Sequence, residues 1–248
     1  MTKTLILIPS RMAATRLPGK PLLKINNLSI ISHVFKKAEE ANIGEVVVAT
    51  EDHEILKDVI KNGGKAILTN NNHKTGTDRI FEAFKKLDIK NVEYILNLQG
   101  DEPNINKNDI VNLNNLMINN NSDIGTLAAI IKDDKMLGNK NVVKVVTENE
   151  LNKNNFPIAT NFIRSNLSKK NQNIYHHIGI YSYKVSTLKK FVNLKQTKNE
   201  IENKLEQLRA LDNKLKINVG LAKFSPIGVD TKEDYLAIKK IMEYKSLK

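Results

Sequence analysis

The stretch Leu5-Ile-Leu-Ile8 decides the fold, because a continuous apolar run of this kind is typical of a strand buried on both faces of a parallel sheet. A basic loop over residues 9–21 follows it directly. The next apolar residues lie at helical spacing on one face, and they are Ile30, Ile31, Val34, Phe35, Ala38 and Ala41. A second strand-like run occupies residues 46–49. This order of strand, helix and strand predicts a right-handed crossover between parallel neighbours.

The same alternation continues along the chain. Further strand-like runs occur at residues 66–68, 94–96, 124–131, 178–183 and 217–221. Helical patterns separate them: we expect one to begin at a Thr77 cap, one to run through residues 201–211, and the last to begin at Thr231. The pattern as a whole predicts an α/β fold with a doubly wound, mostly parallel sheet.

The alternation weakens after Val146, where residues 149–173 are polar and rich in Asn and Lys. A length of 248 residues fits one large α/β domain. We therefore expect a single domain over residues 1–248, with a small excursion at about residues 149–176 that is a loop or a subunit contact.

The composition excludes several classes of site. The chain has no cysteine, which rules out disulfides, thiolate metal sites and cysteine nucleophiles and fits a reducing compartment. Its N-terminal apolar run is too short for a secretory signal, and no run approaches the roughly 18 apolar residues that cross a bilayer. We expect a cytoplasmic protein without membrane insertion.

The net charge is +12 at pH 7, from 39 Lys and Arg against 27 Asp and Glu. Such a charge suggests a nucleic-acid partner. However, the lysines are spread along the whole chain among asparagines, and an aromatic content of 5% without tryptophan offers few platforms for stacked bases. We expect no nucleic acid, and the charge is either a diffuse solvated surface or a basic face toward a small anionic ligand. A basic nucleic-acid-binding protein stays a distant alternative.

The loop over residues 9–21 carries Arg11, Arg16 and Lys20 at the carboxyl end of the first predicted strand. Ligands of open α/β sheets bind outside these ends. Guanidinium forks and a lysine ammonium are the groups that hold a triphosphate. The loop lacks the glycines of the Walker and dinucleotide-binding motifs. Taken alone, it could equally be a basic surface loop.

Two further loops at strand ends supply carboxylates. Asp101 lies in Gln99-Gly-Asp-Glu-Pro103 after the strand at residues 94–96, and Asp230 lies in Gly228-Val-Asp-Thr231 before the last helix. Hard carboxylate oxygens beside substrate phosphates suit Mg²⁺. Each has a plainer interpretation, an acidic turn for Asp101 and a helix-start carboxylate for Asp230. Together with the basic loop, the two aspartates predict a metal–phosphate site.

Residues 8–22, IPSRMAATRLPGKPL, resemble the signature loop of the 3-deoxy-manno-octulosonate cytidylyltransferases, the CMP-KDO synthetases. Further segments agree with that family in order and spacing: His73-Lys-Thr-Gly-Thr-Asp-Arg79, Asn97-Leu-Gln-Gly-Asp-Glu-Pro103, Asn141-Val-Val-Lys-Val-Val146, His177-Ile-Gly-Ile-Tyr181, Leu205-Glu-Gln-Leu-Arg209 and Gly228-Val-Asp-Thr231. The resemblance spans nearly the whole chain. It implies a Rossmann-like nucleotidyltransferase fold and a homodimer.

The resemblance also implies an activity, the transfer of CMP from CTP to the anomeric hydroxyl of 3-deoxy-D-manno-octulosonate (KDO), an eight-carbon acidic sugar, for lipopolysaccharide biosynthesis. It assigns Lys20, Asp101 and Asp230 as catalytic residues, with Mg²⁺ held by the two aspartates. The residues it assigns to CTP are Arg11, Arg16, Lys20, Arg79 and Gln99. Those it assigns to the sugar are His177, Tyr181, Glu206 and Gln207.

The sequence departs from the family pattern at Ile158, where the resemblance leads us to expect the arginine of an aromatic-Phe-Ser-Arg stretch ahead of an Ile-Pro. Arg164 is a candidate substitute. This departure bears on the acceptor sugar rather than on nucleotidyl transfer. A cytidylyltransferase for a related acidic or amino-substituted sugar is therefore the nearest alternative.

Overall fold

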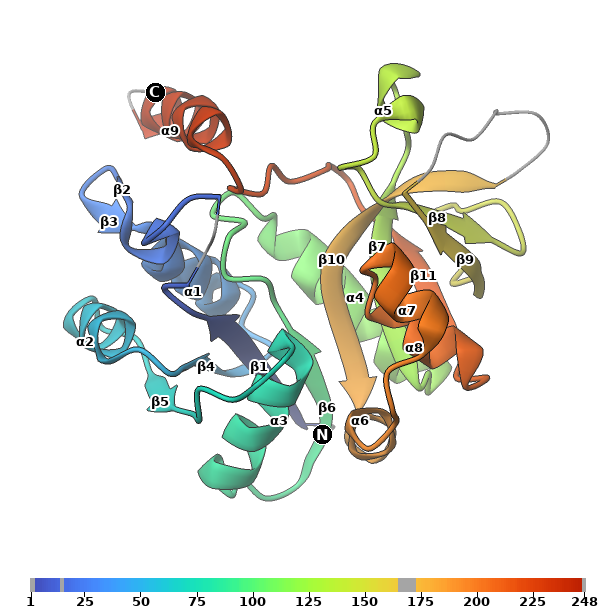
Figure 1. The fold of residues 1–248 in the computed structure, drawn as a ribbon, viewed down its shortest axis with the longest axis horizontal. Coiled ribbons are helices and arrows are strands. Elements are labelled where there is room, and N and C mark those ends of the chain that lie inside the picture. Colours follow the sequence, from blue (N-terminus) through green and yellow to red (C-terminus); the bar gives the residue numbers. More distant parts are fainter. Residues whose placement is uncertain (1–2, 14–15, 165–172, 247–248) are drawn as a thin grey trace. The chain divides into compact units, whose positions relative to one another are not determined.

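The computed structural model describes residues 3–13, 16–164 and 173–246. Its contacts divide the chain into two compact units (Figure 1). Unit 1 comprises Met1–Val111 and Pro226–Lys248, and unit 2 comprises Asn112–Ser225. The expected excursion at residues 149–176 forms part of unit 2, and its residues 165–172 lie outside the described chain.

Four parallel strands of unit 1 belong to the main sheet, in the order β6 (Val92–Asn97), β1 (Lys3–Ser10), β4 (Gly44–Thr50) and β5 (Ala66–Leu68). β1 lies between β6 and β4, where Ile6 pairs with Val46 on one side and Leu96 on the other. The four apolar residues 5–8 are at most 1% exposed. The predicted burial of this strand on both faces is confirmed.

The crossovers of unit 1 run through α1 (Ile30–Glu40), α2 (His53–Lys61) and α3 (Gly76–Leu87). The chain moves outward from β1 to β4 and β5 and then returns to β6 on the other side of β1 (Figure 1). Right-handed crossovers therefore place α1 and α2 on one face of these strands and α3 on the opposite face. The carboxyl ends of β1 and β6 form the switch point at which open α/β sheets bind ligands.

Unit 1 is completed by short elements and by α9 (Lys232–Ser246), which follows the chain's return from unit 2. The short elements are the 3₁₀ helix η1 (Lys20–Leu22) and a hairpin of β2 (Lys24–Ile25) and β3 (Leu28–Ser29). α4 (Lys107–Asn120) begins in unit 1 and ends in unit 2.

The two predicted threonine caps have different outcomes. The backbone N–H of Asp234 donates to Thr231 Oγ1 at 3.2 Å, which confirms the cap of α9. The cap of α3 is Thr75 rather than Thr77, because the Asp78 N–H donates to Thr75 Oγ1 at 3.1 Å. Thr75 has an extended backbone, as an N-cap requires, whereas Thr77 is already helical and only 1% exposed. The prediction of Thr77 as the cap was wrong.

Unit 2 mixes parallel and antiparallel pairs. β7 (Ile124–Ala129) pairs in parallel with β11 (Ile217–Leu221) and antiparallel with the long β10 (Ile174–Lys184). β8 (Lys144–Thr147) pairs antiparallel with β10 and with β9 (Ala159–Ile163). Helices α5 (Lys135–Gly138) and α6 (Val185–Val192) join these strands. The α/β class with a mostly parallel sheet is confirmed, and the antiparallel pairs of unit 2 involve β7, β8, β9 and β10.

The helix expected at residues 201–211 is two helices, α7 (Lys198–Asn203) and α8 (Gln207–Asp212). The break is at Lys204, which adopts the left-handed conformation with a φ of 53°. A buried ion pair joins the two pieces, in which Arg209 Nε and Nη2 donate to the Glu200 carboxylate at 2.8 and 2.6 Å. A continuous apolar pattern concealed this turn.

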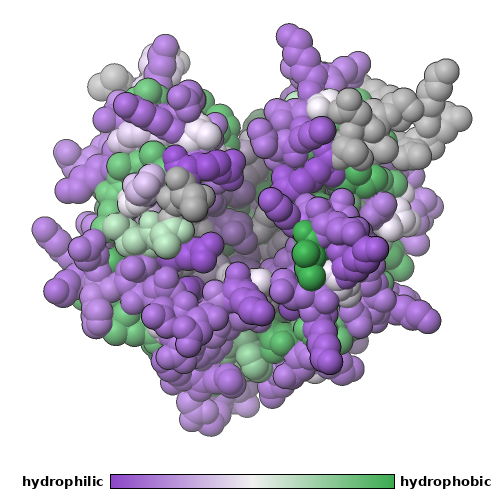
Figure 2. All heavy atoms as spheres, in the orientation of Figure 1, coloured by the Kyte–Doolittle hydropathy of each residue, from purple (hydrophilic) through white to green (hydrophobic). Residues whose placement is uncertain are grey.

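The surface is mostly hydrophilic in Figure 2, with apolar residues in small separate patches. Among the described residues, the helices are all too short or too polar to serve as a membrane span.

Gly44 tests the close pairing of β1 and β4. A Cβ placed there would lie 1.9 Å from the backbone oxygen of Thr4, and only a shift of one strand relieves that clash. We expect Gly44→Ala to lower the free energy of unfolding by about 1–3 kcal/mol, the usual cost of overpacking, as measured by urea denaturation. Gly228→Ala is the matched control, since its Cβ would meet nothing within 4 Å. Equal stabilities of the two variants would contradict this account of the pairing.

Candidate active site

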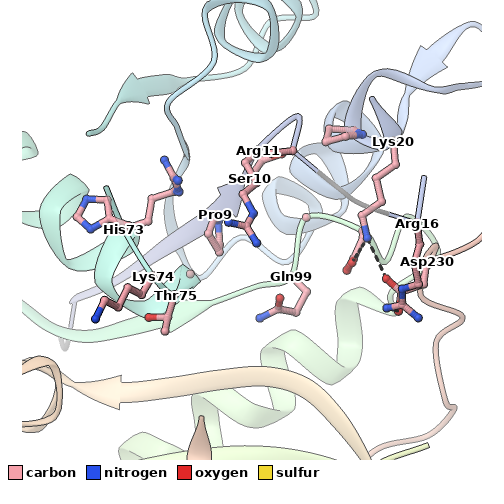
Figure 3. A pocket seen from close by; sticks show the side chains of 16 residues that line it. Pro9, Ser10, Arg11, Arg16, Lys20, His73, Lys74, Thr75, Gln99 and Asp230 are labelled. Carbon is pink, nitrogen blue, oxygen red and sulfur yellow. Dashed lines mark hydrogen bonds and ion pairs between the residues drawn. The ribbon is translucent and has the colours of Figure 1, made fainter. Parts of the chain in front are cut away.

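A pocket of about 360 Å³ lies in unit 1 at the carboxyl ends of β1 and β6 (Figure 3). Three segments form it: the loop that follows β1, the segment from His73 to Arg79 at the start of α3, and the turn that follows β6. Asp230, which precedes α9, completes the lining. The pocket brings together all seven residues of unit 1 that the sequence assigned to the site, namely Arg11, Arg16, Lys20, Arg79, Gln99, Asp101 and Asp230.

Lys20 is oriented by the turn before it. Gly19 has a φ of 70°, a left-handed conformation that favours glycine, and it caps the 3₁₀ helix that Lys20 begins. The Leu22 N–H donates to the Gly19 oxygen at 3.0 Å, and Pro21 is buried. This fixed turn directs the Lys20 side chain toward Asp230, as Figure 3 shows, and toward Asp101.

The Lys20 ammonium bridges the two aspartates. Its Nζ donates to Asp101 Oδ2 at 2.6 Å, to Asp230 Oδ1 at 3.1 Å and to the Val229 oxygen at 2.8 Å. The Lys20 side chain is 15% exposed. Burial alone would lower the pKa of Lys20, but Asp101 and Asp230 outweigh burial and raise it, so the ammonium stays charged.

The Asp230 segment is held in place on both sides. The Val229 N–H donates to the Asp101 oxygen at 2.9 Å, which ties the segment to the turn after β6. The Val229 side chain is fully buried in a cluster with Ile25, Ile30 and Ile238, which come from the hairpin, α1 and α9. Apolar packing therefore presents the Asp230 carboxylate to the pocket.

Two arginines of the loop after β1 extend the basic lining. Arg16 Nη2 lies 2.8 Å from Asp230 Oδ2, with a side chain that is 59% exposed, so solvent screens this pair. Arg11 lies between the His73–Thr75 side and the Lys20 side of the pocket in Figure 3. The loop thus faces the pocket with three cationic side chains.

Arg79 is placed differently from the other cations. It is 3% exposed, forms an ion pair with Glu51 and donates to Thr69 Oγ1 at 2.6 Å. Its guanidinium therefore ties α3 to the segments that follow β4 and β5. A contact between Arg79 and nucleotide stays a prediction, and the structure adds a role in fixing the pocket wall.

Glu82, which no motif assigned to the site, holds the segment before α3 in place. Its carboxylate accepts hydrogen bonds from the Asn70 N–H at 3.0 Å and from Lys86, and it contacts His73 Nε2. Burial raises the pKa of Glu82, but these partners outweigh burial and lower it to about 2. The residues of this network are spread over two turns of helix α3 and the loop before it. The motif that begins at His73 was therefore the one sequence signal that pointed to this region.

The residues assigned to the acceptor sugar lie together in unit 2. The ring centroids of His177 and Tyr181 on β10 are 5.4 Å apart, and His177 Nε2 is 3.1 Å from Thr126 Oγ1. Burial lowers the pKa of His177 to about 3, so its imidazole is neutral. Burial, with the nearby Glu206 carboxylate contributing, raises the pKa of Tyr181. Gln207 is the first residue of α8, next to Glu206.

The comparisons with known proteins agree with this geometry. A model of the cytidylyltransferase family matches residues 5–217. The chain is 44% identical over 253 residues to the 3-deoxy-manno-octulosonate cytidylyltransferase of Thermodesulfovibrio yellowstonii, covering 96% of this chain and 98% of that protein. It is 43% identical over 250 residues to the protein of the same name from Rhodopseudomonas palustris, covering 98% and 99%. The chain belongs to the 3-deoxy-manno-octulosonate cytidylyltransferase family.

A solved structure of a cytidylyltransferase in complex with CTP supports the same assignment. It is entitled CMP:2-keto-3-deoxy-manno-octonic acid synthetase and is 32% identical in sequence. The match has a TM-score of 0.89 and covers 98% of this chain and 100% of that one. The predicted nucleotidyltransferase fold is confirmed, and the protein is a nucleotidyltransferase.

Ile158 and Arg164 lie at opposite ends of β9 in this cytidylyltransferase. Ile158 precedes β9 and forms a bridge with Asn218, whereas Arg164 follows β9 and donates to the Lys140 oxygen at 3.4 Å. At about 3.3 Å per residue, a strand of this length separates them by roughly 20 Å. Burial, with the charge of Arg164 contributing, lowers the pKa of His177, so compensation by Arg164 for the arginine absent at position 158 stays a prediction.

Glu82 makes stability depend on pH in a predictable direction. Its folded-state pKa of about 2 lies below the ordinary value of 4.5, so its contribution is complete above about pH 5 and is lost as the pH falls toward 2. We expect the difference in free energy of unfolding between wild type and Glu82→Gln to shrink over that range, as measured by urea denaturation. The exposed Glu93→Gln is the control for loss of one carboxylate. A difference that does not change with pH would contradict the proposed network.

Proposed function

We propose that this protein transfers CMP from CTP to KDO, giving CMP-KDO and pyrophosphate for lipopolysaccharide biosynthesis. The observation that carries the proposal is the pocket in which Arg11, Arg16 and Lys20 meet Asp101 and Asp230. Near-full-length similarity to KDO cytidylyltransferases supports this donor and this acceptor. A cytoplasmic location and a homodimer are parts of the same proposal.

Magnesium is the metal that the pocket chemistry favours. Within the described residues, His, Cys, Asp and Glu side chains nowhere gather in threes as an all-protein metal site would require. Asp101 and Asp230 are instead a pair of hard carboxylates beside a triphosphate-sized basic loop, and Mg²⁺ commonly takes one or two carboxylates plus substrate phosphates. When bound, it would neutralise phosphate charge and lower the pKa of the attacking hydroxyl.

The basic side chains suit the donor. The anomeric oxygen of the sugar forms a bond to the α-phosphorus of CTP while the bond from that phosphorus to the bridging oxygen breaks, and the hydroxyl proton leaves to solvent. Negative charge grows on the departing pyrophosphate. The positive charges of Lys20, Arg11 and Arg16 in the pocket stabilise that negative charge, which lowers the barrier. Gln99 and Arg79 bind the remaining part of the nucleotide.

The acceptor is assigned to unit 2. His177, Tyr181, Glu206 and Gln207 offer neutral and acidic polar groups suited to sugar hydroxyls. His177 serves as a neutral hydrogen-bonding group, because its pKa of about 3 keeps it uncharged near pH 7. Ile158 supports one alternative acceptor, a related acidic or amino-substituted sugar, since the arginine that the family pattern has at this position is absent.

One activity matrix tests the proposal. We expect pyrophosphate release only when CTP, Mg²⁺ and KDO are all present, with slower release for other nucleoside triphosphates. The panel of acceptors includes KDO, its 8-amino analogue and a nine-carbon acidic sugar. Fastest turnover with another sugar would establish the alternative acceptor. No release by folded protein with any acceptor would refute the activity.

The two aspartates are tested by charge-neutralising variants. Asp101→Asn and Asp230→Asn each remove one anionic ligand, and we expect kcat to fall about 100-fold or more, as for loss of other electrostatic stabilisers. Asp88→Asn is the matched control, because Asp88 is an exposed residue at the end of α3. Circular dichroism checks the fold of each variant. Near-wild-type kcat in either aspartate variant would remove that residue from the mechanism.

A further inference from the structure

The protein's own cations occupy three of the four carboxylate oxygens of Asp101 and Asp230, the two residues that a metal ion would need. All three protons of the Lys20 ammonium are used, by Asp101 Oδ2, Asp230 Oδ1 and the Val229 oxygen. Arg16 Nη2 takes the other oxygen of Asp230 at 2.8 Å. Both aspartates are thus neutralised from within the chain.

A metal ion and the Lys20 ammonium cannot share these oxygens. Mg²⁺ binds carboxylate oxygens at about 2.1 Å, and a lysine nitrogen within hydrogen-bond distance of the same oxygens would place two cations in contact. Like charges so close repel strongly where solvent is partly excluded, and the Lys20 side chain is only 15% exposed. Binding of the metal therefore requires Lys20 to leave the aspartates.

The pocket offers Lys20 another partner only when an anion is bound. Lys20 and Arg16 line the same cavity as Arg11, which is the part of the pocket suited to a triphosphate. Phosphate oxygens there would accept from both side chains in place of the aspartates. Lys20 and Arg16 each exchange a carboxylate partner for a phosphate partner. Because each cation keeps an anionic partner, the free-energy cost of this exchange is small.

We propose that Lys20, assisted by Arg16, closes the metal site in the free protein, and that the triphosphate of the nucleotide opens it by drawing both cations away. The inference rests on the proposed function for the identity of the metal and the nucleotide. It makes metal and nucleotide binding interdependent, since each favours the arrangement that the other needs. In the free protein, Lys20 also keeps the aspartates side by side without mutual repulsion.

The test measures binding of Mn²⁺ alone, without nucleotide, from the electron paramagnetic resonance signal of the free ion. We expect wild type to bind Mn²⁺ weakly at this site and Lys20→Met to bind it at least about tenfold more tightly. Arg16→Met should have a smaller effect, because Arg16 holds one oxygen and is 59% exposed. The gain must vanish in the double variant Lys20→Met, Asp101→Asn, which shows that the ion binds at the aspartates.

Lys24→Met is the matched control, since it removes the same charge from an exposed residue close by in the sequence. Its Mn²⁺ affinity should equal that of wild type. Lys20→Gln, which keeps an uncharged donor, provides a second test if Lys20→Met folds poorly in circular dichroism. Equal affinity in wild type and a folded Lys20 variant, or an equal gain in Lys24→Met, would overturn the inference.

Failure of the proposed function would look different. If the aspartates bind Mn²⁺ more tightly in Lys20→Met but wild type transfers no CMP, the closed metal site is supported and the activity is wrong. If wild type transfers CMP and the Lys20 variants gain no affinity, the activity is supported and the closed site is wrong.

Discussion

The ammonium group of Lys20 joins two aspartates that are far apart in the sequence. Asp101 lies in the turn after β6. Asp230 comes much later in the sequence, after the chain has passed through unit 2 and returned to unit 1. Lys20 holds both, at 2.6 and 3.1 Å. The arrangement of the pocket depends on this bridge, because without a cation the two carboxylates would repel each other.

The bridge is possible because β1 is the centre of unit 1. Its apolar residues 5–8 are buried on both faces, which fixes where the strand ends and the basic loop begins. The neighbouring β6 ends at the same edge and delivers Asp101. A switch in the direction of the crossovers leaves space between these two ends. The position of the chemistry therefore follows from the burial of one strand.

The sequence was sufficient for those parts of the fold that depend on local pattern. Apolar runs located the four parallel strands of unit 1, and Thr231 capped the last helix as predicted, whereas the short hairpin of β2 and β3 was missed. Local pattern did not predict the helix end at Lys204, where a contact between residues distant in the helix pattern determines the structure. The apolar pattern continues through Lys204, but the chain turns there and Glu200 pairs with Arg209 across the turn. Neighbouring threonines were likewise indistinguishable as caps, since only the backbone conformation at Thr75 separates them.

The candidate site was predictable as a set of residues but not as a set of contacts. Motif and strand-end position selected the residues that line the pocket, including both aspartates. No pattern could show that Arg79 is neutralised by Glu51, because those two residues meet only through the packing of α3 against the strands. Likewise, no pattern could show the hydrogen bonds of Glu82 or the bridge that Lys20 forms between the two aspartates.

A crystal structure of the protein with CTP and Mg²⁺ tests the central claim most directly. The account predicts one metal ion held by Asp101 and Asp230, with the Lys20 ammonium moved from the carboxylates to the triphosphate. A structure in which Lys20 still bridges the two aspartates while the metal and the phosphates lie elsewhere would contradict it.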